Sequence, residues 1–198
     1  MKFKGIGLFL LVLLIFLSVS AVYSEDTGDI DLNNTVYVNN SYTGDLEDGS
    51  AIHPFKTVQD GVANLINQSK SNIFIADGEY EINSALSFRN NTINIIGEYN
   101  VTLNAKGNSN IFTFTDGSYT ISNIIFLNGR GLEKDDITYG GAIFINSSNA
   151  NEFDPKAVEE PLVYTNVLIK NCVFSNNTAL RGGAIFGNYS DIALEENL

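Results

Sequence analysis

The sequence is poor in cysteine, histidine and positive charge, and these shortages exclude several classes of protein. Cys172 is the only cysteine, so the chain forms no internal disulfide and lacks the framework common in small secreted domains. With 23 acidic against 11 basic residues, the formal net charge of -12 argues against nucleic acid as a partner, because phosphates attract basic surfaces. Stability must come from an apolar core, for which 44% hydrophobic residues in 198 are sufficient.

Long apolar runs are also missing, apart from one at the start of the chain. Lys2 and Lys4 precede an apolar stretch at residues 6–16, and small residues follow it between positions 18 and 24. This layout is typical of a secretory signal peptide over residues 1–24. A retained membrane anchor is the alternative, but the stretch is shorter than the ~20 apolar residues that a spanning helix needs. We therefore expect a secreted protein of the cell surface or cell wall that meets a membrane only during export.

Exported chains can carry N-linked glycans, and the sequence offers many acceptor sites. The motif Asn-x-Ser/Thr without an intervening proline predicts a surface asparagine that a glycosylating host modifies. An asparagine-rich chain also produces some of these motifs by chance. The candidate sites are Asn33, Asn39, Asn67, Asn90, Asn100, Asn146, Asn176 and Asn188.

Helical patterning after the signal peptide is confined to one segment, residues 54–66. Thr57 is placed to cap the helix, with Asp60 three positions later in a near capping box. A short amphipathic helix ahead of a run of strands suits the closing of an exposed core end. We expect a flexible leader at residues 25–34 and an N-terminal segment at 35–71 that holds a first strand, a loop and this helix. The apolar face of the helix consists of Val58, Val62, Leu65 and Ile66.

From residue 72 onward the sequence changes to β-rich runs of three to six residues separated by turn signals. Strands without intervening helices exclude a doubly wound fold. An antiparallel sandwich predicts hairpin turns and no repeated residue identities. Because this sequence repeats its residues at equivalent places, we predict an all-β fold, a parallel β-helix (solenoid) over residues 72–198. The predicted strands cover 35–38, 73–76, 86–88, 93–96, 101–103, 111–114, 119–126, 141–145, 162–174 and 183–186.

The repeat consists of two stretches, residues 119–146 and 168–188. An Asn-x-x-Phe element recurs after 48 positions (171 minus 123), and a Gly-Gly-Ala-Ile element recurs after 42 (182 minus 140). The first copy therefore carries six extra residues between its halves, and we expect each copy to form two turns of the solenoid. The repeated residues are Asn123, Phe126, Gly140, Gly141, Ala142 and Ile143 in the first copy, and Asn171, Phe174, Asn177, Gly182, Gly183, Ala184 and Ile185 in the second.

Each repeated residue type has a physical role in a stacked fold. Inward side chains of successive turns stack, so Cys172 and Phe174 should continue the columns of the first copy. The repeated asparagines should turn the chain and form an internal ladder of amides, because asparagine tolerates left-handed dihedral angles. The Gly-Gly pairs should supply positive φ or close backbone approach. Cys172 is then a small buried hydrophobe rather than a reactive thiol.

These motifs resemble those of known surface proteins. The Gly-Gly-Ala-Ile elements at 140–143 and 182–185, with Phe-Ser-Asn-Asn at 174–177, are similar to the repeats of polymorphic outer-membrane adhesins. The segments Asp-Gly-Ser…Pro-Phe-Lys-Thr-Val-Gln at 48–59 and Asn-Cys-x-Phe-x-Asn-Asn at 171–177 more closely resemble the adhesin-like surface proteins of methanogenic archaea. That resemblance implies a right-handed, single-stranded parallel β-helix of the pectate-lyase-like superfamily. It leaves the activity open, because fold does not fix chemistry.

The chain also departs from that family. Phe-Leu-Asn-Gly at 126–129 differs from the repeat at its last position, and such proteins normally run much longer. We therefore expect a short or truncated member, in which Glu195 and Glu196 protect the edge of the last turn by their charge.

Because pectate-lyase-like folds include polysaccharide lyases and glycoside hydrolases, a carbohydrate-active enzyme is one alternative function. Such chemistry needs converging groups, either paired carboxylates or a metal-bound acidic sugar with a strong base. The only histidine, His53, precedes the helix, and the arginines are scattered. Asp77 and Asp116 precede glycines in turn signals. We expect no catalytic residues, no metal and no cofactor.

The predicted function is that of a non-catalytic scaffold that presents loops for adhesion. Two inserts, 131–138 and 147–161, interrupt the repeat and must leave it as loops, where repeat proteins usually carry recognition. The expected partners are surface glycans or proteins of other cells, and a passive cell-wall or surface-layer spacer is the other alternative. The candidate binding residues are Glu133, Asp135, Asp136, Glu152, Phe153, Asp154, Glu159 and Glu160.

Overall fold

The computed structural model describes residues 31–148 and 164–198. The chain divides into two units, Met1–Leu32 and Asn33–Leu198, and the strands described below belong to the second. The predicted signal peptide, most of the leader and most of the insert at 147–161 lie outside the described residues. Within the described ranges, no helix has the length and apolar character needed to cross a membrane.

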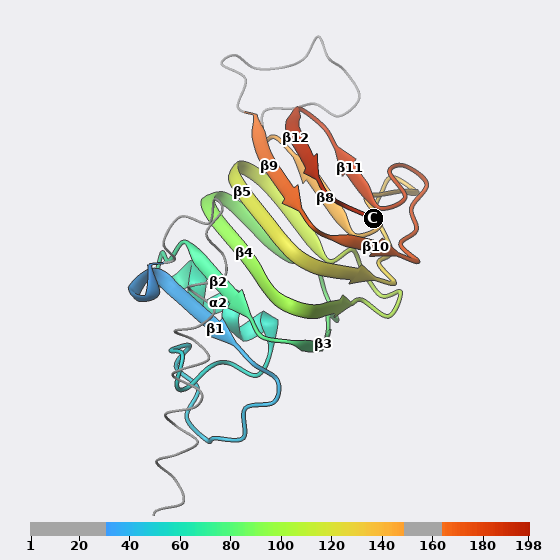
Figure 1. Ribbon diagram of the computed structural model, residues 1–198. Helices are drawn as coiled ribbons and strands as arrows, with labels where there is room; N and C mark the ends of the chain where they lie inside the picture. Colours follow the sequence, from blue (N-terminus) through green and yellow to red (C-terminus); the bar gives the residue numbers. More distant parts are fainter. Residues whose placement is uncertain (1–30, 149–163) are drawn as a thin grey trace, which may run out of the picture. The chain divides into compact units, whose positions relative to one another are not determined.

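The described part of the second unit is mostly β, with ten strands in one parallel sheet (Figure 1) and a separate antiparallel hairpin. The main path of the sheet runs β1-β2-β4-β5-β8-β11, and the other four strands pair beside it. The prediction of an all-β fold with parallel pairing is confirmed. The strands are β1 (Thr35–Val38), β2 (Asn72–Ile75), β3 (Gly78–Glu81), β4 (Leu86–Asn104), β5 (Phe112–Leu127), β8 (Ile143–Asn146), β9 (Thr165–Lys170), β10 (Val173–Ser175), β11 (Ile185–Gly187) and β12 (Ser190–Glu195), and the hairpin is β6 (Leu132–Lys134) with β7 (Ile137–Tyr139).

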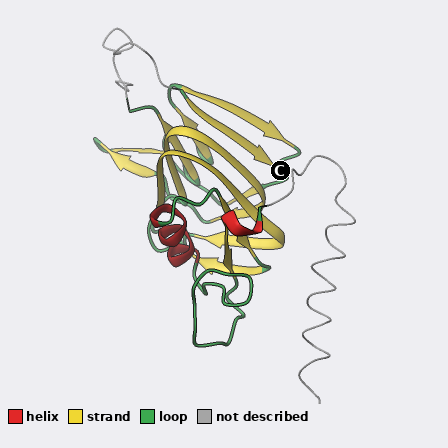
Figure 2. Ribbon diagram, turned by 90° about the vertical axis from the view of Figure 1, so that its left-hand side faces the viewer, coloured by secondary structure: helices red, strands yellow, loops and turns green. Residues whose placement is uncertain are grey.

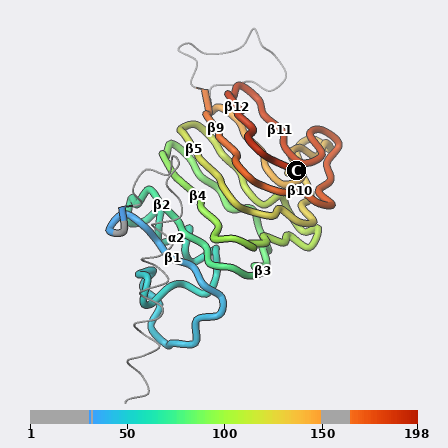
Figure 3. The backbone as a smooth tube through the Cα atoms, viewed as in Figure 1, coloured from blue at the N-terminus to red at the C-terminus, as the bar shows by residue number. Residues whose placement is uncertain are grey.

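The sheet consists of three parallel ladders, and β4 and β5 take part in all of them. The first ladder joins the starts of β4 and β5 to β8 and β11. The second joins their middles to β9 and β12, with β2 and β1 pairing on the other side of β4. The third joins their ends to β3 and β10. Each long strand therefore bends twice as it passes from one ladder to the next, as the backbone path shows (Figure 3).

The prediction of strands three to six residues long is wrong for β4, with 19 residues, and β5, with 16. At the first bend, Asn90 and Asp116 both have a left-handed backbone, with φ of 54° and 55°. The residues before them, Arg89 and Thr115, are register partners, and so are the residues after them, Asn91 and Gly117. Asn90 and Asp116 therefore lie at the same position of the two strands. Because both strands turn at the same position, the ladder continues through the corner and the strand does not end there.

The core consists of columns of apolar residues at equivalent register positions. Ile95, Ile121 and Ile169 are successive partners in the second ladder, and all three are buried. Aromatic rings stack in the same way: Phe126 and Phe174 are register partners whose ring planes differ by 8° at a centroid distance of 4.9 Å. Stacked aromatic pairs of this kind contribute about 0.5–1.5 kcal/mol beyond the area they bury.

The two repeat copies lie one strand apart in the sheet. Ile185 is the register partner of Ile143, and Phe174 is the register partner of Phe126. Equivalent residues are thus direct neighbours, so the expectation of two turns per copy is wrong and one copy advances the sheet by a single strand. Cys172 is fully buried as predicted, and burial raises the pKa of its thiol to about 11, far from the range of a reactive thiolate.

The repeated asparagines turn the chain as predicted, with φ of 60° at Asn123 and 48° at Asn171. The Asn171 amide donates to Asn123 Oδ1 at 2.9 Å, and the Asn123 amide donates to Gly97 O at 3.2 Å. The ladder is not internal as predicted, since Asn171 is exposed and Asn123 is half-buried. Similar amide pairs join Asn94 to Asn72, Asn128 to Asn104 and Asn188 to Asn146.

The Gly-Gly pairs supply both properties that were expected of them. Gly140 and Gly182 have φ of 58° and 60°, which favours glycine. Gly141 lies under the backbone of the next copy, where an added Cβ would be 1.9 Å from the carbonyl oxygen of Gly183. Asn177 locks the same corner, since its side chain accepts from the Gly129 N–H at 2.7 Å and donates to Phe126 O at 2.9 Å.

The predicted helix is present as α2 (Val58–Asn67), drawn in red in Figure 2. Thr57 caps it by accepting from the Asp60 N–H at 3.1 Å. Val58, Val62 and Leu65 join the core against β1 and β2, whereas Ile66 is 41% exposed, so its assignment to the apolar face is wrong. Position 66 lies at the side of the helix, where the neighbouring strands no longer cover it.

The outer edge of β1 is covered by the loop that leads to α2. The Phe55 N–H donates to Tyr37 O at 3.0 Å, and the Asn39 N–H donates to Phe55 O at 2.7 Å. This loop is fixed by Lys56, whose ammonium contacts Glu47 at 3.0 Å and Gly44 O at 2.9 Å. A covered edge strand does not offer its backbone to another chain.

Several elements were not predicted. The leader ends in a 3-10 turn, η1 (Leu32–Asn34), and Asn34 accepts from the Ser71 N–H at 2.9 Å, so the end of the leader is joined to the folded part. β3 contains Gly78, Glu79 and Glu81, and β12 contains Asp191 and Glu195, which are residue types depleted in strands. Tertiary pairing with β4 and β9 overrides these weak local preferences.

Alanine at Gly141 and at Gly183 should have different effects, although the two glycines are equivalent in the repeat. At Gly141 the new Cβ meets backbone, so we expect a loss of about 1–3 kcal/mol in the free energy of unfolding. At Gly183 the nearest atom to an added Cβ is 4.0 Å away, so G183A is the matched control and should be nearly neutral. Denaturant midpoints check this, and equal losses in both variants would contradict the stacking of the two copies.

Candidate functional site

The β6–β7 hairpin is the six-residue insertion that distinguishes the two repeat copies. The bridges Arg130 with Thr178 and Tyr139 with Arg181 align the copies on either side of it. Between these bridges the first copy has eight residues, 131–138, and the second has two, 179–180. The predicted insert at 131–138 therefore has the right boundaries, but it is a regular hairpin and not an irregular loop.

The tip of the hairpin is formed by two aspartates in an unfavourable backbone conformation. Asp135 and Asp136 have φ of 51° and 61°, as a two-residue type I′ turn requires. Asn-Gly is the preferred sequence for such a turn, because left-handed dihedrals cost non-glycine residues about 1–2 kcal/mol. Both side chains are exposed, so the turn holds two carboxylates in solvent at the end of the hairpin.

The base of the hairpin is held by the strands on both sides of it. The Arg130 N–H donates to Ser109 O, and the Gly131 N–H donates to Thr178 O, each at 2.9 Å. Tyr139 is buried at the end of β7, with its ring 4.9 Å from that of Phe186 and the Arg181 guanidinium 5.6 Å from its centroid. The Tyr139 hydroxyl has no hydrogen-bond partner among the described residues. Only the outer part of the hairpin projects from this fixed base.

Two open pockets border the hairpin. One, of 470 Å³, lies between the hairpin and residues 178–180, where Leu180 is 74% exposed. The other, of 440 Å³, lies between the hairpin and two polar loops at 83–85 and 108–110. Arg130 and Glu133 line both pockets, so these two side chains stand at the centre of the candidate site.

The charged groups of the site are available to a ligand. Arg130 and Glu133 are exposed, and within the described ranges neither makes an ion pair. The polar side chains of Asn83, Ser84 and Asn108 likewise have no hydrogen-bond partner in the described part of the chain. Arginine, carboxylate and amide groups in this arrangement can donate to and accept from the hydroxyls of a saccharide or the polar groups of a peptide.

The residues that were considered for catalysis and set aside lie in separate places. Asp77 accepts from the backbone N–H groups of Tyr99 and Asn100 at 2.8 Å, and Asp116 accepts from Ser148 N at 2.9 Å, so both hold turns. His53 Nδ1 lies 3.5 Å from Asp48 in the loop before α2. The described residues include no cluster of three or more metal-ligating side chains. The candidates Glu152, Phe153, Asp154, Glu159 and Glu160 lie outside the described residues.

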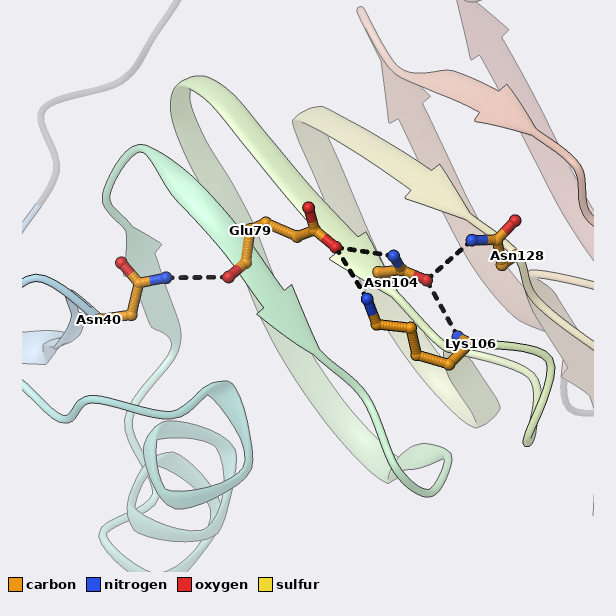
Figure 4. A network of polar contacts seen from close by, with 5 residues as sticks. All are labelled: Asn40, Glu79, Asn104, Lys106 and Asn128. Carbon is orange, nitrogen blue, oxygen red and sulfur yellow. Dashed lines mark hydrogen bonds and ion pairs between the residues drawn. The ribbon is translucent and has the colours of Figure 1, made fainter.

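A second polar cluster connects successive strands of the third ladder (Figure 4). Glu79 Oε1 accepts from the Asn104 amide at 2.7 Å and contacts Lys106 Nζ at 3.3 Å, while Asn104 Oδ1 accepts from Asn128 at 3.0 Å. Asn40 donates to Glu79 O at 2.9 Å. Since these groups satisfy one another, the cluster stabilises the stack and leaves few groups for a ligand.

Sequence reasoning identified the hairpin carboxylates but not their neighbours. Arg130 appeared as one of three scattered arginines, and the loops at 83–85 and 108–110 appeared as ordinary turns. A signal was available for Arg130, because it directly precedes the insertion. The contribution of the two polar loops depends on strand register, which brings segments more than 20 positions apart together at one edge.

The fold and the site define a mostly β protein with a parallel sheet and a charged surface hairpin between two open pockets. No protein-family model, no curated protein and no solved structure matches the chain. The assignment of a function therefore depends on the geometry of this site.

The predicted glycosylation sites differ in accessibility, and this difference predicts which of them carry a glycan in the folded protein. Asn67, Asn90, Asn100 and Asn176 are exposed, whereas Asn146 and Asn188 are half-buried and their amides hydrogen-bond at 3.1 Å. In a glycosylating host we expect occupancy at the exposed sites in folded, secreted protein, since a glycan on either stacked amide breaks the ladder. Site-resolved mass spectrometry of the secreted material checks this. High occupancy at Asn146 with unchanged thermal stability would contradict the amide pairing.

Glu79 should make the stability depend on pH. Hydrogen bonds from Asn104, and then from Lys106, lower the pKa of Glu79 below its ordinary value of 4.5. The stabilisation is therefore complete above about pH 4.5 and is lost as the pH falls through the lower folded-state pKa. Denaturation midpoints between pH 7 and 3 should fall less steeply in E79Q than in the unmodified protein. The control E133Q, at an unpaired surface position, should keep the original slope.

Proposed function

We propose that this chain is an exported, adhesin-like surface protein, whose sheet forms a right-handed parallel β-helix that presents the β6–β7 hairpin for binding to glycans or proteins of other cells. The observation that carries this proposal is the hairpin itself, a regular insertion that holds the exposed carboxylates of Glu133, Asp135 and Asp136 on a fixed base. Loops on a rigid scaffold are where repeat proteins usually carry recognition.

The register supports a β-helix. β4 and β5 pass through the three ladders in the same order, and their partners are 26 positions apart in the first two ladders (112 minus 86 and 117 minus 91). In the third ladder the offset is 23 (124 minus 101), and offsets this close to one another are what a coil with one strand per ladder in each turn produces. Connections between parallel strands are right-handed in about 98% of proteins, which supports the proposed hand.

The charge of the hairpin supports a role in recognition. The type I′ turn keeps Asp135 and Asp136 where Asn-Gly would be more stable, and natural proteins commonly accept such a cost at functional positions. Arg130 and Glu133 add a donor and an acceptor beside the two pockets. With a net charge of -12, the chain repels polyanions at long range, which favours neutral glycans or basic protein surfaces as ligands.

Removal of residues 132–137 tests the proposal, because it gives the first copy the length of the second. We expect this variant to fold, since the bridges on either side then enclose two residues, as in the second copy. Binding to cells or to a glycan array should fall by at least about ten-fold if the hairpin supplies a ligand contact of about 1.4 kcal/mol. Circular dichroism and the thermal midpoint establish that the scaffold is intact.

The double variant D135N/D136G separates shape from charge. It installs the preferred turn and should raise the stability of the hairpin, visible as slower hydrogen exchange at residues 132–139. If the carboxylates contact the ligand, binding is lost although the hairpin is better formed. Unchanged binding in both variants would overturn the proposal, and release of reducing or unsaturated sugars from polysaccharides would show an enzyme.

A further inference from the structure

The pocket between the hairpin and the two polar loops contains a buried side chain with an unused hydrogen-bond acceptor. Asn110 lines this pocket and is only 1% exposed. Its amide nitrogen donates to Phe112 O at 2.8 Å and to Thr113 Oγ1 at 2.9 Å, and because a backbone carbonyl only accepts, these bonds fix which end of the amide faces inward. Asn110 Oδ1 has no hydrogen-bond partner among the described residues, and unlike the Tyr139 hydroxyl it is not sealed inside the core. Buried acceptors in proteins are nearly always paired, so this oxygen marks a place for a donor.

The walls of the same pocket are held in place by the backbone. The Asn108 N–H donates to Ala105 O, and the Leu86 N–H donates to Ile111 O, each at 2.9 Å. Leu86 and Phe112, which follow the two polar loops, are register partners, so the loops lie one strand apart, at about 4.8 Å. A pocket with fixed walls binds a ligand without first ordering them, which lowers the entropic cost of binding.

The side chains of the pocket offer donors and acceptors together, and its two charged residues carry opposite charges. Asn110 Oδ1 and the Glu133 carboxylate only accept, the Arg130 guanidinium only donates, and the exposed amides and hydroxyl of the polar loops do both. A phosphate has no donor for the two acceptors, and an ammonium has no acceptor for the guanidinium. A hydroxyl both donates and accepts, so a ligand with several hydroxyls and no charge satisfies all of these groups.

The other pocket beside the hairpin has a different chemistry. Glu133 and Asp136 line it together with Arg130, which leaves an excess of negative charge. Leu180 is 74% exposed there and supplies an apolar wall. Such a pocket suits a basic or partly apolar group. The two pockets therefore favour different ligands, and a neutral polar ligand fits the one that Asn110 lines.

We infer that the pocket between the hairpin and the two polar loops binds one neutral sugar residue of a surface glycan. Asn110 Oδ1 accepts from one hydroxyl of the sugar, while Arg130 and Glu133 contact the hydroxyls on the hairpin side. Ala85 and Leu132 line the same pocket and offer apolar surface to the C–H groups of the ring. This inference rests on the proposed function, and it narrows the ligand from glycans or proteins to a neutral glycan.

A glycan array that carries neutral hexose oligosaccharides and matched oligosaccharides of uronic acids tests the class of ligand. The full chain should bind the neutral sugars, and its affinity for the best neutral trisaccharide should change less than about two-fold between about 50 and 500 mM salt, because salt screens only charged groups. In an NMR titration with that trisaccharide, the side-chain amide signals of Asn110 should shift while the backbone signals of residues 178–180 stay in place. Binding to uronic acids alone, an affinity that falls steeply with salt, or no binding of any neutral sugar would overturn the inference.

The variant S84W tests the position of the sugar. Ser84 is exposed and lines this pocket and not the other, so an indole there should exclude the sugar and lower the affinity by at least about ten-fold. S118W is the matched control, because Ser118 is also exposed but lines neither pocket, and it should keep the affinity within about two-fold. N108A removes one exposed amide without filling the pocket and should weaken binding about five-fold. Unchanged thermal midpoints establish that all three variants are folded.

Comparison with the variant that lacks residues 132–137 separates this inference from the proposed function. If that deletion abolishes binding to cells but S84W leaves both cell binding and sugar affinity unchanged, the role of the hairpin stands and the sugar pocket is wrong. If S84W abolishes sugar binding while the deletion leaves cell binding intact, the sugar pocket stands and the proposed role of the hairpin is wrong.

Discussion

The register that sets each residue beside its equivalent on the previous strand is the constraint on which this structure depends. It places Phe174 on Phe126 and Ile185 on Ile143, and it stacks left-handed corners at Asn90 and Asp116. Since the first corner of β4 is repeated in β5, the ladder continues through that bend, and at the second bend it resumes after an irregularity between Ile96 and Val101. Stability is therefore distributed along columns of like residues, which compensates for the missing disulfides.

The same constraint decides where the surface can vary. A residue in a column is fixed by its neighbours above and below, but a connection between ladders can lengthen if its two ends keep their bridges. The β6–β7 hairpin does this between Arg130 and Tyr139, and its closing pairs stay in register with Thr178 and Arg181. The hairpin thus adds a charged projection without disturbing the core, which explains how one repeat copy can carry it while the other lacks it.

Much of the fold could be predicted from residues whose local chemistry favours one kind of position. The turning asparagines, the corner glycines, the buried Cys172 and the capped helix are all present where local chemistry indicated.

The features that the sequence did not predict all depend on neighbouring strands. β3 and β12 are strands only because β4 and β9 lie beside them, Ile66 is exposed because no strand covers its side of the helix, and the lengths of β4 and β5 depend on stacked corners. The candidate site was predicted in part, since the insertion was visible but the loops beside it were not.

The sequence by itself determined the repeat, the parallel pairing of strands and the place of the insertion, because these follow from residue identities and their spacing. Only the tertiary structure decided which residues at the same position of the repeat also have the same surroundings. Gly141 and Gly183 occupy the same position in the repeat, yet only Gly141 has another strand's carbonyl oxygen against it. Ile169 and Leu194 share a column, yet one is buried and the other exposed. The physical reason is that stacking is cumulative, so the environment of a residue depends on whether a further layer lies over it, and the local sequence does not encode that layer.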